Sequence, residues 1–378
     1  MVNFRKLLIL ALIASPSVVI ASDNESVNAT VVYGLDTNPH QLSSGLMPVE
    51  QKFVAGEFKL RSDIYKTFYF SAKAEKSVYF DDARADQLNA SANLALKSDF
   101  KIFKQKFKYK IAANYRAKDK TYVSKTTGLV ATFGGRSIAD RYDSTQINYL
   151  GELSYKLHKF LKLDISYQSR EKIYQDYDIA GLSNLDYAQQ FVQLGMQYKA
   201  SDVGRFYLNL AVKQREYIDK RIKDLEGIDI AATDLIYDYH TVNIGYIFRP
   251  GKDIRWKFAY NYEDRADNGL GYFNANSGYL SIAGKYRFGN YHFLKSRVKY
   301  SQFSFVNQLD QGEDPLDEEA KEKQGVSLMV GYEWVVATLF DSNFAVYLEL
   351  EYSNFDNTNT IYTYERSMAS IGIRWSAF

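Results

Sequence analysis

The 378-residue chain contains no cysteine, only 5 prolines and 4 histidines, and almost no excess charge. The absence of cysteine excludes disulfides, thiolate metal sites, iron–sulfur clusters, cysteine nucleophiles and a lipidated N-terminal cysteine. Because 47 basic residues nearly balance 45 acidic ones, the chain lacks the clustered positive charge that sequence-independent nucleic-acid binding requires. No internal apolar run is long enough to form a membrane-spanning helix.

Aromatic side chains are abundant. The chain contains 32 Tyr, 24 Phe and 3 Trp, which together make up 16% of its residues. Aromatic residues favour strands, whereas proline is tolerated only at strand edges and bulges. Many aromatics, few prolines and balanced charge therefore indicate β-structure with one wet face and one apolar face.

The first 21 residues predict an export signal. Arg5 and Lys6 form a charged start, an apolar stretch follows, and the segment ends in small residues. The alternative, a membrane anchor, is disfavoured because the apolar stretch is short and is interrupted at Pro16. The sequence thus predicts a cleavable signal peptide over 1–21 and a mature domain over 22–378, exported across a bacterial inner membrane.

After position 22, apolar residues occupy alternate positions in one segment after another, as in 107–116, 256–262 and 326–334. Successive side chains of a strand point to opposite faces, so each segment has one apolar and one polar face. Sixteen such segments lie near 27–34, 50–61, 66–80, 87–98, 106–118, 142–157, 161–171, 186–200, 204–217, 234–249, 254–265, 277–288, 292–306, 324–337, 343–355 and 364–377. The connections between them alternate between long and short.

This pattern predicts an all-β fold: a transmembrane, antiparallel, up-and-down β-barrel of about 16 strands. Barrels of this kind have short periplasmic turns and long surface loops, and closure satisfies every backbone polar group in lipid. Tyr286, Tyr332 and Trp334 lie at strand ends, where an interfacial aromatic girdle is expected. The alternative, a soluble sandwich or solenoid, explains neither the signal peptide nor the loop pattern. We therefore expect the protein in the outer membrane of a Gram-negative bacterium.

Residues 33–39 read YGLDTNP and end the first segment. The placement of Asp36, Asn38 and Pro39 resembles the start of proteobacterial barrels of the β-barrel porin type two family. Barrels of exopolysaccharide export and of surface-lipoprotein assembly begin similarly. The same three residues are ordinary turn formers, so an Asx-type turn is their expected physical role.

The chain ends in Phe378, and a terminal aromatic is a common recognition signal for the barrel-assembly machinery. Ile371, Ile373 and Trp375 of the last segment are out of phase with it, which departs from the usual pattern of such strands.

The polar face of the segments is predicted to line the lumen, and sixteen strands leave room for an aqueous channel. Acidic residues on that face are fewer: Glu57, Glu75, Glu152, Asp164, Glu263, Glu333, Glu349 and Glu351. Basic residues on it are Lys59, Lys73, Lys97, Lys108, Lys110, Arg116, Lys156, Lys162, Arg170, Lys213, Arg215, Arg255, Lys257, Lys285, Arg287, Lys295, Arg297, Lys299, Arg366 and Arg374.

Seven of these form a predicted pore-lining set that we call the basic stripe: Arg255, Lys257, Lys285, Arg287, Lys295, Arg297 and Lys299. Rings of Lys and Arg in a pore favour anions, and a low-dielectric wall focuses their field. The alternative is structural, because opposite charges on neighbouring strands often pair and only add rigidity.

Two long connections carry further hypotheses. The connection 119–141 includes an apolar patch over 129–133 and is expected either to fold inward as a constriction or plug, or to form a mobile loop or short outer hairpin. The connection 307–323 is acidic, but its spacing does not match a calcium loop, so a solvated loop, bridged to lipopolysaccharide by divalent ions, is favoured.

An enzyme is not expected, because neither His240 nor His40 has a nucleophile or partner at a suitable spacing. No catalytic residue, metal site or cofactor is predicted. The leading hypothesis is a porin-like channel for passive diffusion of small polar solutes, biased towards anions. The alternative is an export or assembly barrel for exopolysaccharide or surface proteins, and a surface adhesin or receptor is a third class.

Expected partners are outer-membrane lipid, lipopolysaccharide and the barrel-assembly machinery, with no nucleic acid. Whether the barrel acts alone or as a homo-oligomer stays open, because parity does not distinguish a subunit contact from lipid-facing wall.

Overall fold

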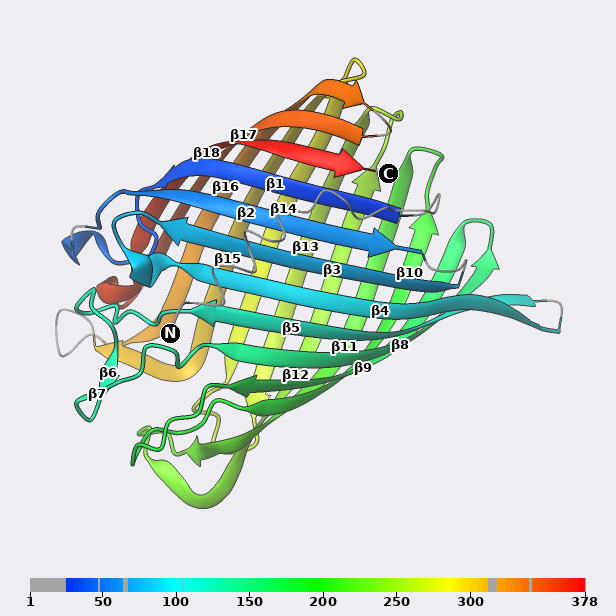
Figure 1. Cartoon of the computed structure of the whole chain (residues 1–378). Helices are drawn as coiled ribbons and strands as arrows, with labels where there is room; N and C mark the ends of the chain where they lie inside the picture. Colours follow the sequence, from blue (N-terminus) through cyan, green and yellow to red (C-terminus); the bar gives the residue numbers. More distant parts are fainter. Residues whose placement is uncertain are drawn as a thin grey trace.

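The structure is a computed structural model that describes residues 25–46, 48–63, 67–103, 105–311, 318–339 and 342–377. Within them the chain forms one closed barrel of sixteen antiparallel strands, in which each strand pairs with its neighbours in sequence (Figure 1). The first and last strands pair over Val27–Ala377 to Asp36–Met368 and close the ring. The predicted fold class is confirmed. The predicted signal peptide over 1–21 and Phe378 lie outside the described residues.

The strands follow the predicted segments closely in number and position. They are β1 (Glu25–Asp36), β2 (Gln51–Ser62), β3 (Phe68–Tyr79), β4 (Gln87–Ile102), β5 (Gln105–Lys120), β8 (Ser144–His158), β9 (Leu161–Tyr174), β10 (Tyr187–Lys199), β11 (Gly204–Lys223), β12 (Asp229–Phe248), β13 (Ile254–Asp267), β14 (Ala275–Phe288), β15 (His292–Gln311), β16 (Glu318–Leu339), β17 (Ser342–Asn357) and β18 (Tyr364–Ala377). Three short 3₁₀ turns are η1 (Ser44–Leu46), η2 (Ala83–Ala85) and η3 (Thr360–Tyr362). No helix among the described residues is long and apolar enough to cross a membrane.

Two predicted loops are instead extensions of strands. The connection 218–233 is largely taken up by the ends of β11 and β12, which stay paired as far as Lys223 and Asp229. In the acidic connection 307–323, Asp310 of β15 pairs with Glu319 of β16. The strict alternation is interrupted there, because the ladders have register shifts between Glu216 and Lys223 and between Ser304 and Leu309. Backbone pairing continues without that signal, since it needs no apolar side chain.

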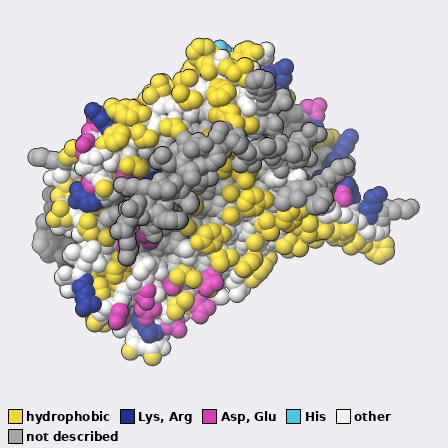
Figure 2. Space-filling model, in the orientation of Figure 1, with side chains coloured by type: hydrophobic (Ala, Val, Ile, Leu, Met, Phe, Trp, Pro, Cys, Tyr) yellow, Lys and Arg dark blue, Asp and Glu magenta, His cyan; other side chains and the backbone are white. Residues whose placement is uncertain are grey.

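The outer face of the barrel is apolar. Ile165 is 50% exposed, Val298 47% and Ile373 62%, and each alternates with polar neighbours on its strand. Hydrophobic side chains cover much of the face shown in Figure 2, while Lys and Arg gather mainly towards its two ends. Such exposure is costly in water but matches a hydrocarbon surround. Together with closure of the sheet, it makes the chain a membrane-spanning barrel of the outer-membrane type.

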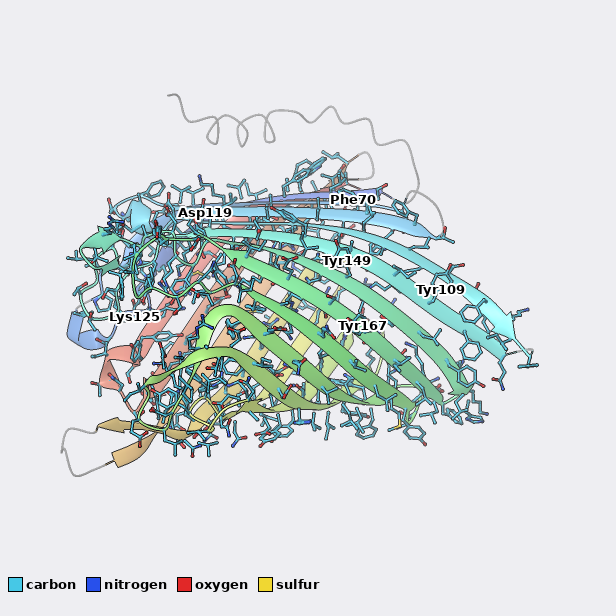
Figure 3. All side chains as sticks on the ribbon, turned by 90° about the horizontal axis from the view of Figure 1, so that it is seen from below. Phe70, Tyr109, Asp119, Lys125, Tyr149 and Tyr167 are labelled. Atoms are coloured by element: carbon cyan, nitrogen blue, oxygen red, sulfur yellow. The ribbon has the colours of Figure 1, made fainter. Side chains whose placement is uncertain are left out.

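Aromatic side chains form part of a belt at the end with the short connections. The His292 ring stacks with Phe288, Tyr332 and Trp334 at centroid distances of 5.3, 6.1 and 6.0 Å. Figure 3 shows further tyrosines on the wall of β5, β8 and β9, of which Tyr149 is 61% exposed. The rings around His292 lie at strand ends and suit the interface between hydrocarbon and headgroups, where the sequence predicts a girdle.

Candidate functional site

Ion pairs between strands that are two apart in the ring show which face of the sheet lines the interior. Lys213 of β11 binds Glu263 of β13, and Arg374 of β18 lies 2.7 Å from Glu333 of β16. Side chains from strands two apart can meet only on the concave side of a curved sheet. Because alternate residues share a face, the strand register then assigns every other position to the interior.

The basic stripe lies on this inner face, near the short-connection ends of β13, β14 and β15. Arg255 pairs in register with Lys285, which pairs in turn with Lys295, so three cations form one lateral row. Lys257 and Arg297 occupy the two sides of Ala283 in the next row. Like charges placed directly opposite one another destabilise a sheet.

Two members of the stripe have acidic partners. Lys295 Nζ lies 2.9 Å from Glu333 Oε2, and Arg287 Nε lies 3.1 Å from Asp253 Oδ1. Among the described residues the other five carry no ion pair; three of their ammonium groups lie over rings instead, Lys257 over Tyr207, Lys285 over Phe293 and Lys299 over Tyr279. The structural alternative therefore holds for part of the stripe, and most of its charge faces the lumen unpaired.

The wall around the β1–β18 closure has the opposite character. Glu57 lies between Lys59 and Lys73 at 2.5 and 2.8 Å, and Lys73 also reaches Glu75 at 2.7 Å. A cavity of about 410 Å³ borders these residues, with Glu349 and Glu351 on its far side. Half of the eight predicted inner acids border this cavity. Glu57 and Glu75 are matched by cations, whereas Glu349 and Glu351 have no ion pair among the described residues.

The first-loop motif forms a buried clasp at this closure. Asp36 is 0% exposed and accepts both prongs of the Arg366 guanidinium, at 2.9 and 2.5 Å, together with the Tyr79 hydroxyl at 2.9 Å. Asn38 is also buried; its side-chain amide donates to the carbonyls of Leu42 and Glu365. Asp36 and Asn38 thus serve as turn and clasp residues, and Pro39 follows in the same turn.

The connection 119–141 forms a small outer hairpin, β6 (Thr132–Phe133) with β7 (Arg136–Ser137), beyond the end of β5 (Figure 1). The segment before the hairpin contacts the first loop through Lys125. Lys125 Nζ donates to the carbonyls of His40 and Gln41, and Arg84 donates to the carbonyl of Gly128 at 3.1 Å. Burial, followed by the charges of Lys120 and Lys323, lowers the pKa of Lys125 to about 8.

Of the two expectations for this connection, the structure has the outer hairpin. Its apolar patch is only partly covered, because Ala131 is buried whereas Leu129 is 62% exposed. The contacts of Lys125 join the start of the connection to the first loop, and a narrowing of the mouth stays a prediction.

A pair that sequence spacing does not reveal joins two loops: His40 Nε2 lies 2.9 Å from Asp82 Oδ2. Burial lowers the pKa of His40, while hydrogen bonds from Arg84 and then from His40 hold the pKa of Asp82 well below its usual range. Both side chains are largely buried, and Asp82 is engaged by Arg84 as well. The pair therefore acts as a latch between the loop 37–50 and the turn η2.

The inner face also carries an aromatic cluster that the sequence analysis did not single out. Its buried members from β10, β11 and β12 are Tyr187, Tyr217, Tyr237 and Tyr239. The Arg215 guanidinium lies 4.5 Å from the Tyr187 ring centroid and 5.3 Å from that of Tyr239. The sequence could have revealed this cluster, because these tyrosines lie an even number of residues from polar inner positions of their own strands.

Among the described residues no group of three or more His, Cys, Asp or Glu side chains is arranged to hold a metal ion. Of the acidic connection, residues 312–317 lie outside the described part of the chain. Bridging of that hairpin to lipopolysaccharide stays a prediction.

No family model matches this chain, and no curated protein matches it in sequence. Among solved structures, OmpT, an outer membrane protein of Vibrio cholerae, is similar with 14% identity, 94% coverage of this chain, 99% of its own and a TM-score of 0.42. OccAB2 of Acinetobacter baumannii has 12% identity, 94% and 98% coverage and a TM-score of 0.45. CdiB from Acinetobacter baumannii has 10% identity, 94% and 61% coverage and a TM-score of 0.47.

The assignment of the fold comes from the chain's own strand pairing. The resemblance of residues 33–39 to the β-barrel porin type two family stays a prediction.

Proposed function

We propose that the protein is a porin-like channel of the Gram-negative outer membrane, through which small polar solutes diffuse passively with a preference for anions. The observation that carries the proposal is the row Arg255–Lys285–Lys295 on the inner face, where three cations stand side by side. Only Lys295 of the three has an acidic partner, Glu333, so Arg255 and Lys285 add like charge to the row without an ion pair among the described residues. Such an arrangement is expected where the charge itself is used.

The proposal is supported by the width of a sixteen-stranded ring, which leaves an aqueous interior unless a loop or domain fills it. The unpaired cations lie on a wall whose outer side is in hydrocarbon, so their field is directed into the water of the lumen. Several of the acids that would offset them are already bound by cations, among them Glu57 and Glu263.

The test is to refold residues 22–378 in detergent and record single-channel currents in a planar bilayer under a potassium chloride gradient. We expect stable open steps whose reversal potential shows chloride passing more readily than potassium. A clear preference for potassium would contradict the anion bias. A folded, heat-modifiable barrel without conductance would contradict the channel itself and favour a gated export or assembly barrel.

A further inference from the structure

The inner wall formed by β9, β10 and β11 contains a second cavity, of about 230 Å³. We call it the arginine cavity; its lining residues are Gln168, Arg170, Gln189, Phe191, Lys213 and Arg215. It is separate from the basic stripe, which lies on β13–β15. Its volume is below the roughly 300–1,000 Å³ of sites for drug-sized ligands, so a small molecule fits it.

The two guanidinium groups of the cavity lack a carboxylate. Arg170 donates to the side chain of Asn148 at 2.9 Å, and Arg215 reaches only the Tyr217 hydroxyl and the Gln189 amide oxygen, at 3.3 and 3.5 Å. Among the described residues neither arginine has an acidic partner within 4.0 Å, and Arg215 Nε is buried without any hydrogen bond. A guanidinium in this state has donors and charge available for an incoming anion.

The acid that contacts the cavity lining is already occupied. Glu263 is bound by Lys213 and accepts the Thr241 hydroxyl at 3.1 Å. Lys213 is thereby largely neutralised, which leaves Arg170 and Arg215 as the anion-binding groups of the cavity. Because the tyrosine rings beside Arg215 remove water from it, an anion there would meet a stronger field than at an exposed cation.

The cavity also has an apolar side. Phe191 of β10 lies between Gln168 and Lys213 in the register, and its half-buried ring borders the same space as the two arginines. A flat ring can rest on a phenylalanine face, and the amides of Gln168 and Gln189 supply neutral donors beside it. Charge at one side and an aromatic surface at the other define the chemistry of a matching ligand.

We propose that the arginine cavity binds small aryl carboxylates, with the carboxylate between Arg170 and Arg215 and the ring against Phe191. This proposal rests on the proposed channel function in one respect only: that the cavity binds solutes as they pass through the pore. Binding itself requires the folded barrel and not conduction, so the two proposals can fail separately.

The first measurement is calorimetric titration of the detergent-folded barrel with benzoate, benzamide and acetate. Benzamide keeps the ring without the charge, and acetate keeps the charge without the ring. We expect benzoate to bind at least about tenfold more tightly than either, because a charge-assisted bidentate contact and ring stacking each contribute to its affinity. Equal binding of benzoate and benzamide would overturn the role of the arginines, and equal binding of acetate would overturn that of Phe191.

The variants Arg170→Gln and Arg215→Lys separate the site from the fold. Arg170→Gln removes one cation, whereas Arg215→Lys keeps the charge between the tyrosine rings but loses the fork geometry. Each is expected to weaken benzoate binding about tenfold or more. The matched control is Lys156→Gln, an inner-face cation of β8 without an ion pair among the described residues, which should leave the affinity unchanged.

The second measurement adds benzoate to open channels. Concentration-dependent interruptions of the chloride current that disappear in Arg170→Gln would support the site as a station within the pore. Calorimetric binding in a barrel that never conducts would retain the site and contradict the channel. Open channels together with no benzoate binding by calorimetry would retain the channel and contradict the site.

Discussion

Two walls of the same lumen use charge differently. On the wall around the β1–β18 closure, Glu57 lies between two lysines and Asp36 holds Arg366. On the wall of β13–β15, Arg255, Lys285 and Arg297 face the interior without an ion pair among the described residues. On the first wall, ion pairs hold together the strands at which the barrel closes. The second keeps its charge available to solutes, at a cost in stability.

The largest effect is expected from removing the Asp36–Arg366 clasp of the first wall. In Asp36→Ala, the half-buried Arg366 guanidinium and the Tyr79 hydroxyl lose their acceptor. Removing one partner of a buried pair costs about 3–5 kcal/mol, so we expect a large fall in the denaturation temperature of the barrel. The measurement is heat-modifiability on electrophoresis, with denaturant unfolding followed by tryptophan fluorescence.

The matched control on the same wall is Glu75→Gln. Glu75 is more exposed than Asp36, and its partner Lys73 keeps Glu57, so the loss should stay within about 1 kcal/mol. If the two substitutions destabilise the barrel equally, Asp36 is not a clasp.

The second test concerns selectivity. The triple variant Lys285→Gln, Arg297→Gln and Lys299→Gln removes unpaired charge from the stripe and should lower the ratio of chloride to potassium permeability several-fold. The double variant Glu57→Gln with Lys73→Gln removes one acid and one cation from the other wall, and with them three ion-pair contacts, without changing the net charge. We expect reversal potentials to shift in the first variant and not in the second; an equal shift would mean that both walls act alike.

A smaller effect is expected from pH at the loop latch. Because burial lowers the pKa of His40, the opened loop binds more protons than the closed one between that lowered value and about 6.5. His40 Nδ1 is buried without a hydrogen-bond partner, so protonation would leave an unsatisfied N–H. The latch should therefore be intact above pH 6.5 and weaken progressively on acidification below it.

Hydrogen exchange of residues 37–46 at pH 7 and pH 5.5, corrected for intrinsic rates, measures this loss. Asp82 stays ionised over the range, since Arg84 holds its pKa low. His40→Gln should abolish the pH dependence while keeping an amide donor for Asp82. Equal protection at both pH values in the unmodified protein would contradict the latch.

The smallest expected effect is on conductance. Deleting 125–136 removes the Lys125 contacts with the first loop and the β6–β7 hairpin, and should raise the single-channel conductance modestly. Single-channel recording of the deletion variant beside the unmodified protein measures this directly. Unchanged conductance would mean that the connection does not narrow the mouth.

Much of the barrel could be predicted from the sequence, because lipid outside and water inside impose a period of two on every spanning strand. The segment 364–377 coincides with β18, and 161–171 differs from β9 only at its end. Where register shifts interrupt the ladder, as near the ends of β11 and β12, the period of two is lost and the predicted strand stops too early.

The inner-face residues show the same division. Parity alone assigns Arg215 and Lys285 to the lumen, as the register has them. Parity cannot say which cation meets an acid, because Arg374 and Glu333 are 41 residues apart in the sequence and two strands apart in the ring. The tyrosines around Arg215 were missed because an inward-facing aromatic breaks the expectation that the inner face is polar.

By itself, then, the sequence determined the strand count, the two faces of each strand and the excess of inner cations, since each follows from local alternation along the chain. The tertiary structure decided which of those cations are free. Ion pairing depends on which strands become neighbours when the sheet closes, and closure also brings Arg366 to the buried Asp36 to form the clasp.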